Sequence, residues 1–244
     1  ERSADNIVNS VVCGLAQTGY DEVSLTSLSS TDHSQIADVL TRLNKQFQGK
    51  GVRVSVPSQR LDSFGVDMAG LVAGQKKGGL TFAPEAGTQR LRDAINKNLT
   101  EEDLLASCRR AFAGGYSAVK LYFMLGLPTE TDEDVLGIAE VASHVMHAWR
   151  ESASNKNRGV RITVSTSWFV PKAHTAFQWE PQIPKEEYER RVKLLRENML
   201  TKSVTYNWHD SDTSYMEAVI SRGDRRLCRV IETAWRKGEH LSAW

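Results

Sequence analysis

Two spacings of apolar residues, one helical and one strand-like, alternate from the start of the chain. Apolar side chains between residues 5 and 15 recur every three or four positions, which predicts an amphipathic helix. Residues 22–28 alternate apolar and polar side chains and predict a strand. A second helix, carrying Ile36 to Phe47, and a β-branched strand over residues 52–56 follow. The chain therefore begins as repeated helix and strand units.

The same alternation continues through the middle of the chain. Its predicted elements, in order, are a weak helix near 66–75, a short strand at 80–83, a helix around Leu91 and Ile95, a helix after Thr100, a buried strand at 118–125, a helix from Val135 to Trp149 and a strand at 161–170. Thr100-Glu-Glu-Asp103 and Thr131-Asp-Glu-Asp134 resemble capping boxes, so they indicate where two of the helices begin.

The alternation stops after Pro171. An irregular segment gives way to a helix bearing Tyr188, Val192, Leu195 and Met199, and we expect the remaining tail to be helical. Five strands that alternate with helices predict an α/β protein with a parallel sheet. The pattern favours a barrel or partial barrel, although a doubly wound sheet has the same order of elements.

Composition narrows the class of protein. The 244 residues are 40% hydrophobic, and 31 Lys and Arg against 30 Asp and Glu leave a net charge of +1, so no global field attracts nucleic acid or anionic membranes. No apolar run approaches the roughly 20 residues of a membrane span. Cys13, Cys108 and Cys228 have no metal-ligand spacing and are interpreted as buried thiols of a cytoplasmic protein.

Candidate chemistry lies in the loops after the strands, because strand C-termini form the ligand face of parallel α/β folds. These loops are unusually polar. In chain order they are Ser27-Leu-Ser-Ser-Thr-Asp32, Pro57-Ser-Gln-Arg60, Pro84-Glu-Ala-Gly87, Gly126-Leu-Pro-Thr-Glu-Thr131 and Pro171-Lys-Ala-His174.

Three of these segments carry a resemblance. Phe82-Ala-Pro-Glu-Ala-Gly87, Leu121-Tyr-Phe-Met-Leu-Gly-Leu-Pro-Thr-Glu-Thr131 and Phe169-Val-Pro-Lys-Ala-His-Thr-Ala-Phe-Gln178 resemble motifs of radical S-adenosylmethionine (SAM) enzymes, in an uncharacterised group related to methylthiotransferase-like and cobalamin-binding branches. The resemblance implies a partial TIM-like (β/α) barrel over 1–180, with five of six strands visible, and a C-terminal helical extension over 181–244. It also implies that the first strand and the CxxxCxxC cluster ligands precede Glu1.

The resemblance further implies SAM as a cofactor and a [4Fe–4S] cluster in the parent enzyme, with no metal ligand in this chain. The implied SAM contacts are Ser29, Ser30, Arg60, Glu85, Gly87, Lys97, Gly126, Val170 and Pro171. Lys97 and Arg60 compete for the SAM carboxylate, and His174 is a candidate on the substrate side. Without the resemblance, Glu85 is interpreted as an acid at the start of a helix, and Glu130 as a first-turn helix charge.

Several functions stay open. The intact parent is expected to cleave SAM to a 5′-deoxyadenosyl radical that abstracts hydrogen from an unknown substrate. The alternatives are a non-catalytic SAM-fold binding module and a cluster-independent barrel lyase or isomerase. The basic segment 222–229 is a weak indication of RNA binding. The edge of the strand at 22–28 is a candidate for self-association.

Overall fold

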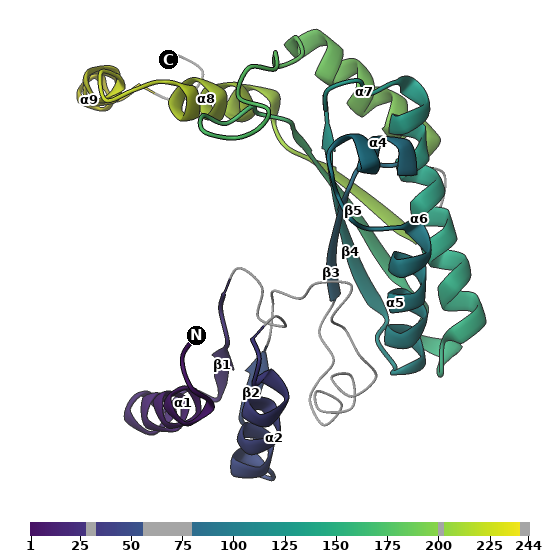
Figure 1. Cartoon of the computed structure of the whole chain (residues 1–244), viewed down its shortest axis with the longest axis vertical. Helices are drawn as coiled ribbons and strands as arrows, with labels where there is room; N and C mark the ends of the chain where they lie inside the picture. The colour runs from purple at the N-terminus through teal and green to yellow at the C-terminus, as the bar shows by residue number, and fades with distance from the viewer. Residues whose placement is uncertain (28–32, 56–79, 200–202, 240–244) are drawn as a thin grey trace. The chain divides into compact units, whose positions relative to one another are not determined.

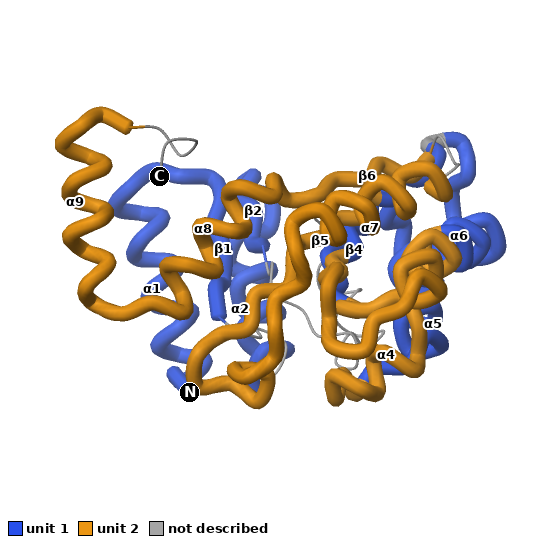
Figure 2. Tube along the Cα trace, turned by 90° about the horizontal axis from the view of Figure 1, so that it is seen from above, with its two compact units in different colours: residues 1–83, 99–121, 143–162 blue, residues 84–98, 122–142, 163–244 orange. Residues whose placement is uncertain are grey.

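The computed structural model describes residues 1–27, 33–55, 80–199 and 203–239. The weak helix expected near 66–75 and the candidate residues Ser29, Ser30 and Arg60 lie outside these ranges. The chain divides into two compact units, one formed by residues 1–83, 99–121 and 143–162 and the other by residues 84–98, 122–142 and 163–244 (Figure 2).

The N-terminal segment of the first unit has its own small core. Helices α1 (Ala4–Thr18) and α2 (Ile36–Phe47) accompany strands β1 (Glu22–Ser24) and β2 (Arg53–Ser55), which pair in parallel with Val23 opposite Val54. The core consists of the buried side chains of Ala4, Val8, Val11, Val39, Leu40, Leu43 and Val54. The predicted elements are confirmed here, although both strands are shorter than expected.

The larger sheet has the strand order β3-β4-β5-β6. Its strands are β3 (Leu80–Glu85), β4 (Ala118–Leu125), β5 (Arg161–Trp168) and β6 (Val204–Trp208). The N–H of Arg161 bonds to the Ser117 carbonyl at 2.9 Å, and the N–H of Phe169 bonds to the Leu125 carbonyl at 2.8 Å. Residue numbers rise together between these bonds, so β4 and β5 run parallel.

One face of this sheet is apolar and buried. In β4 the alternate residues Val119, Leu121, Phe123 and Leu125 are each at most 2% exposed. In β5 the corresponding face carries Ile162, Val164, Thr166 and Trp168. Helices α6 (Asp132–Ser152) and α7 (Lys185–Asn198) lie along this face in Figure 1, and the Trp168 ring stacks on Tyr188 of α7 with centroids 4.9 Å apart. Helices α4 (Gln89–Ala94) and α5 (Glu101–Ala113) connect β3 to β4.

The expectation of an entirely helical tail is wrong at residues 204–208. This segment forms β6, which extends the sheet beyond β5, and the Tyr206 hydroxyl lies 2.8 Å from the Thr166 hydroxyl. Its five residues are too few for a period of two to stand out between two helices. Helices α8 (Ser211–Arg222) and α9 (Leu227–Lys237) follow. Among the helices of the described ranges, none combines the length and apolar character of a membrane span.

Candidate functional site

The C-terminal ends of β3, β4 and β5 meet in one apolar cluster of the second unit. Its buried members are Ala86, Leu91, Leu127 and Phe169. The predicted site residues Glu85, Gly126 and Val170 are the chain neighbours of Ala86, Leu127 and Phe169. Three segments that are distant in sequence therefore present their predicted residues at one edge of the sheet.

Glu85 and Lys97 form an ion pair at this edge. Lys97 Nζ lies 3.4 Å from Glu85 Oε1, and the two side chains are 36% and 27% exposed, so the pair is open to a ligand. Glu85 has φ +70°, an uncommon value for a residue with a side chain. The fully buried Arg92 donates through Nη1 to the carbonyl oxygens of Ala86 at 2.9 Å and Gly87 at 3.3 Å, which holds the turn after Glu85 in place.

Gly87 has a packing role that the sequence did not indicate. A Cβ at this position would lie 2.2 Å from the Asp134 carbonyl oxygen and 2.5 Å from the Ile138 nitrogen of α6. The absence of a side chain thus lets the loop after β3 pack directly on the backbone of α6. We expected this glycine to admit a ligand, whereas the observed close approach is to a helix.

Gly126 ends β4 with φ +89° and its N–H donates a 2.7 Å hydrogen bond to Glu130 Oε2. The side chain of Glu130 is 1% exposed and also pairs with Arg191 of α7. Burial raises the pKa of Glu130 to about 6, against the opposing effects of the Gly126 hydrogen bond and the Arg191 charge. The interpretation of Glu130 as a first-turn helix charge is wrong, because α6 begins at Asp132 and the carboxylate points back to β4.

Ion pairs connect helix α7 to Glu130 and to Asp132 at the start of α6. Arg191 donates to Glu187 at 2.8 Å in addition to its pair with Glu130, and Arg190 bridges Glu187 at 2.7 Å and Asp132 at 2.6 Å. Hydrogen bonds from the two arginines lower the pKa of Glu187 to about 2. The sequence did not indicate that Glu130 is buried and paired, because its partners Gly126 and Arg191 are 4 and 61 positions away along the chain.

The predicted capping role of Asp134 is confirmed and extended. Its carboxylate accepts hydrogen bonds from the Thr131 N–H at 2.8 Å and from the Thr131 hydroxyl at 3.0 Å. It also accepts from the side chains of Thr88 and Arg90 at the N-terminal end of α4. Burial would raise the pKa of Asp134, but these hydrogen bonds lower it overall. Asp134 therefore ties the start of α6 to the start of α4.

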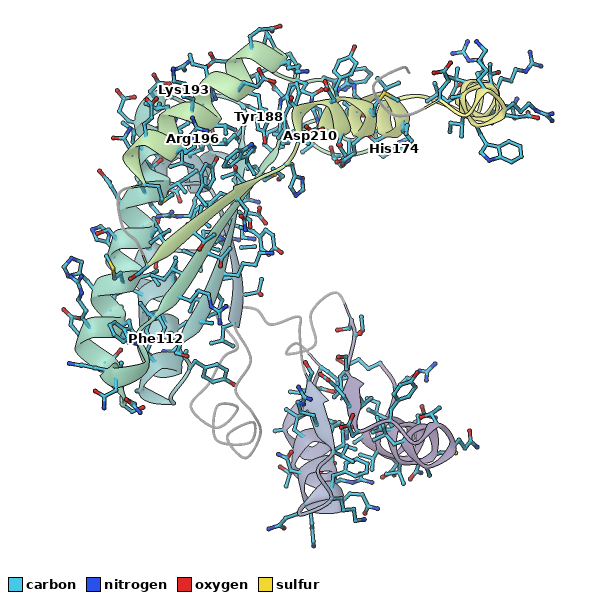
Figure 3. The ribbon with its side chains drawn as sticks, turned by 180° about the vertical axis from the view of Figure 1, so that it is seen from behind. Phe112, His174, Tyr188, Lys193, Arg196 and Asp210 are labelled. Carbon is cyan, nitrogen blue, oxygen red and sulfur yellow. The ribbon has the colours of Figure 1, made fainter. Side chains whose placement is uncertain are left out.

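The loop after β5 lies against α8. Lys172 pairs with Glu217, and Arg222 donates to the Pro171 carbonyl at 3.5 Å. Val170 and Pro171 are buried, whereas His174 is exposed with φ +62°, beside α8 in Figure 3. The structure thus places Val170 and Pro171 at the end of β5 and His174 farther out on the loop.

Two further histidines, His144 and His209, lie outside the edge formed by the ends of β3, β4 and β5. His144 Nδ1 lies 2.5 Å from Glu101 Oε1, and its side chain is 53% exposed on α6. The segment His209-Asp210 leads into α8, and Asp210 caps this helix by accepting from the Thr213 N–H at 2.8 Å.

A hollow opens between α7 and the β6–α8 junction. This cavity of about 340 Å³ is lined by Tyr188, Glu189, Val192, Lys193, Arg196, Trp208, His209, Asp210 and Ser211, of which Figure 3 labels four. Its acids have partners, because Asp210 caps α8 and Glu189 accepts from the Ser211 hydroxyl at 2.8 Å. None of its lining residues is a predicted SAM contact.

The described residues do not fit an iron–sulfur cluster. Cluster irons need several thiolates from neighbouring positions. Cys13, Cys108 and Cys228 lie on α1, α5 and α9, and the described ranges hold no group of three or more His, Cys, Asp or Glu side chains suited to a metal. Cys108 is buried, and burial raises the pKa of its thiol to about 12. Cys13 and Cys228 are exposed, so the prediction of three buried thiols is wrong for these two.

Two known proteins resemble nearly all of this chain. The uncharacterized protein MJ0966 of Methanocaldococcus jannaschii is 26% identical over 235 residues, which are 95% of this chain and 48% of that protein. The chain thus spans about half the length of this curated relative. The archaeal Elp3 of Methanocaldococcus infernus with an N-terminal deletion (1–46) is 10% identical with a TM-score of 0.54, over 96% of this chain and 59% of that one.

HydG, a maturase of the [FeFe]-hydrogenase, is 15% identical with a TM-score of 0.47, over 91% of this chain and 48% of that one. The Elp3 likeness shows the fold alone, which agrees with the predicted partial TIM-like barrel. The sequence model of the radical SAM superfamily matches residues 1–142, more than half of the chain. The chain therefore belongs to the radical SAM superfamily.

Proposed function

We propose that this chain binds SAM at the C-terminal edge of β3 and β4, with the Glu85–Lys97 pair holding the methionyl end. The observation that carries the proposal is this partly exposed pair, whose charges lie 3.4 Å apart. The amino-acid end of SAM carries one ammonium and one carboxylate. Glu85 offers the complementary charge to the ammonium and Lys97 to the carboxylate, so the ligand replaces one ion pair by two.

The adenosyl end is proposed to lie toward Gly126 and the end of β5. Ile183 fills the space beside Gly126 where a side chain would lie, so Gly126 offers only its backbone, and Val170 and Pro171 provide a buried apolar wall. Glu130 is a positioning residue in this scheme, since it holds the Gly126 N–H without facing the ligand. Ser29, Ser30 and Arg60 remain proposed contacts from the preceding loops.

In the whole protein, a [4Fe–4S] cluster with bound SAM would supply reductive cleavage of SAM, which is the general activity of the superfamily. No step of that chemistry is assigned to the described residues, because they offer no cluster ligands. What this chain contributes is binding and orientation of the cofactor. For the whole protein, we propose radical SAM catalysis on a substrate that is not identified.

The test is isothermal titration of SAM into the purified chain and its variants. Glu85→Gln and Lys97→Met keep the shape of each side chain but remove its charge. Each should weaken SAM binding by about 10- to 100-fold, the usual effect of losing a charged hydrogen bond. Glu140→Gln, an exposed acid on α6, is the matched control and should leave binding unchanged. Absence of binding to the unmodified chain, or equal affinity in all variants, would reject the proposed site.

A further inference from the structure

The hollow between α7 and the β6–α8 junction is separate from the proposed SAM site. Its lining residues all fall between positions 188 and 211, within the second unit, and none of them is a predicted SAM contact. Its volume of about 340 Å³ is in the range of small-molecule pockets. We call it the α7–β6 hollow.

The buried part of its lining is apolar and held in place. Tyr188 is 1% exposed and Val192 is 7% exposed, and both belong to α7. The Tyr188 ring stacks on Trp168, and its hydroxyl donates to the His209 carbonyl at 2.9 Å. The polar group of Tyr188 is thus already satisfied, and a ligand meets apolar surface there.

An exposed indole forms another part of the lining. Trp208 ends β6 and is 43% exposed. It lies against the Tyr206 ring, with the centroids 5.2 Å apart. A large aromatic side chain that is packed on one neighbour and remains open beside a cavity offers a surface on which a flat ring can stack.

The basic side chains of the lining are open to a ligand. Lys193 Nζ lies 3.9 Å from Glu197 Oε1, and the Lys193 side chain is 68% exposed. Arg196 and the His209 imidazole have no hydrogen-bonding or ion-pair partner in the part of the chain that the structure describes. Lys193 and Arg196 are three positions apart on α7, where side chains are neighbours, and Figure 3 labels both on this helix.

The two acids of the lining are engaged by the protein itself. Asp210 accepts from the Thr213 N–H at 2.8 Å and from the Thr213 hydroxyl at 2.9 Å, and these bonds lower its pKa. Glu189 accepts from the Ser211 hydroxyl at 2.8 Å. The acceptors are therefore occupied, whereas the guanidinium donors of Arg196 are available.

We propose that the α7–β6 hollow binds a phosphate-bearing aromatic ligand of the chemical class of a nucleotide, with its base on Trp208 and its phosphate on Arg196 and Lys193. An apolar ligand would desolvate the two cations without compensation. A small anion alone would leave the indole unused. A nucleotide combines a flat ring with a phosphate, which a guanidinium binds through paired hydrogen bonds.

The test is a titration of the full chain, followed by ligand-observed NMR at low ionic strength. The probes are UMP, uridine and ribose 5-phosphate, because the base of UMP differs from the adenine of SAM. UMP should bind at least about 5-fold more tightly than either partial ligand, since each lacks the stacking or the phosphate contact. A short oligouridylate distinguishes the two sources of this chemistry: tighter binding than UMP assigns the hollow to a nucleotide within a strand, and weaker binding assigns it to a free nucleotide.

Variants locate the site. Trp208→Leu should weaken UMP binding about 5- to 100-fold through lost stacking, and Trp208→Phe should retain most of the affinity. Arg196→Met should weaken it about 5- to 20-fold. Trp235→Leu and Arg229→Met, at exposed positions of α9, are matched controls that should bind UMP normally. Thermal unfolding of each variant establishes that it folds.

Each contrary result overturns a stated part of the proposal. Uridine that binds as tightly as UMP would reject the role of the cations, and equal binding of ribose 5-phosphate would reject stacking. Equal affinity in the hollow variants and their controls, or binding of neither UMP nor the oligonucleotide, would reject the site. The proposal is independent of the SAM site, so Glu85→Gln and excess SAM should both leave UMP binding unchanged.

Discussion

Gly126 and Glu130 are joined by a 2.7 Å hydrogen bond from the backbone N–H of one to the carboxylate of the other. The bond links the end of β4 to an acid whose side chain is 1% exposed. Because Arg191 of α7 contacts the same carboxylate, a helix more than 60 positions away along the chain acts on the backbone of the candidate SAM site.

Glu130 should make stability depend on pH near neutrality. Burial raises its pKa from 4.5 to about 6, so the folded state holds the proton more tightly than the unfolded state does. The stabilisation is complete below pH 4.5 and is lost as pH rises through 6, by roughly 2 kcal/mol. Glu130→Gln stays neutral at every pH. As the pH rises from 4.5 to 7.5, the parent should lose this stabilisation and the variant should not. The unfolding free energy of the variant should therefore rise by roughly 2 kcal/mol relative to that of the parent.

Denaturant unfolding at a series of pH values measures this difference. Glu140→Gln is the control, since Glu140 is exposed on the same helix, and its difference from the parent should stay constant. A constant difference for Glu130→Gln would contradict a raised pKa.

Removing Arg191 should destabilise the protein strongly. Its side chain is 11% exposed and faces the buried Glu130 carboxylate. Arg191→Met leaves that carboxylate buried without its counter-charge and should lower the unfolding free energy at pH 7 by about 3–5 kcal/mol. Adding Glu130→Gln to Arg191→Met should recover part of the loss. Lys193→Met, at a 68% exposed side chain of α7, should change stability by less than about 0.5 kcal/mol.

Gly126→Ala should destabilise for two separable reasons. The residue has φ +89°, and an added Cβ would lie 2.8 Å from Ile183 Cδ1. We expect a loss of about 1–3 kcal/mol. In a double-mutant cycle with Ile183→Ala, the double variant should lose less than the sum of the single variants, because only the backbone strain remains. Gly14→Ala, with open space in α1, should stabilise the protein by up to about 1 kcal/mol.

The three cysteines should differ in their reactivity toward a thiol reagent. Cys13 and Cys228 are exposed, whereas Cys108 is buried and burial raises its pKa to about 12. A thiol reagent at pH 8 should modify two cysteines rapidly in the native protein and the third only after denaturation. Mass spectrometry of the digested protein identifies the modified residues. Rapid native modification of Cys108 would contradict the burial of α5 in the core.

Local sequence patterns were sufficient to predict most of the helices and strands. Thr100 and Asp103 form the predicted capping box, with both hydrogen bonds present, because its partners are three positions apart. The strand at 118–125 was predicted with its observed bounds, since its buried residues alternate without interruption. The polar loops after the strands were also visible, and Glu85, Lys97 and Gly126 do share one edge of the sheet.

Contacts between distant segments decided the rest. The pairing of β6 with β5, the burial of Glu130 under Arg191 and the close approach of Gly87 to α6 each depend on partners more than 40 positions away. A periodic pattern reports which side of an element is buried, and it does not identify the element that covers it.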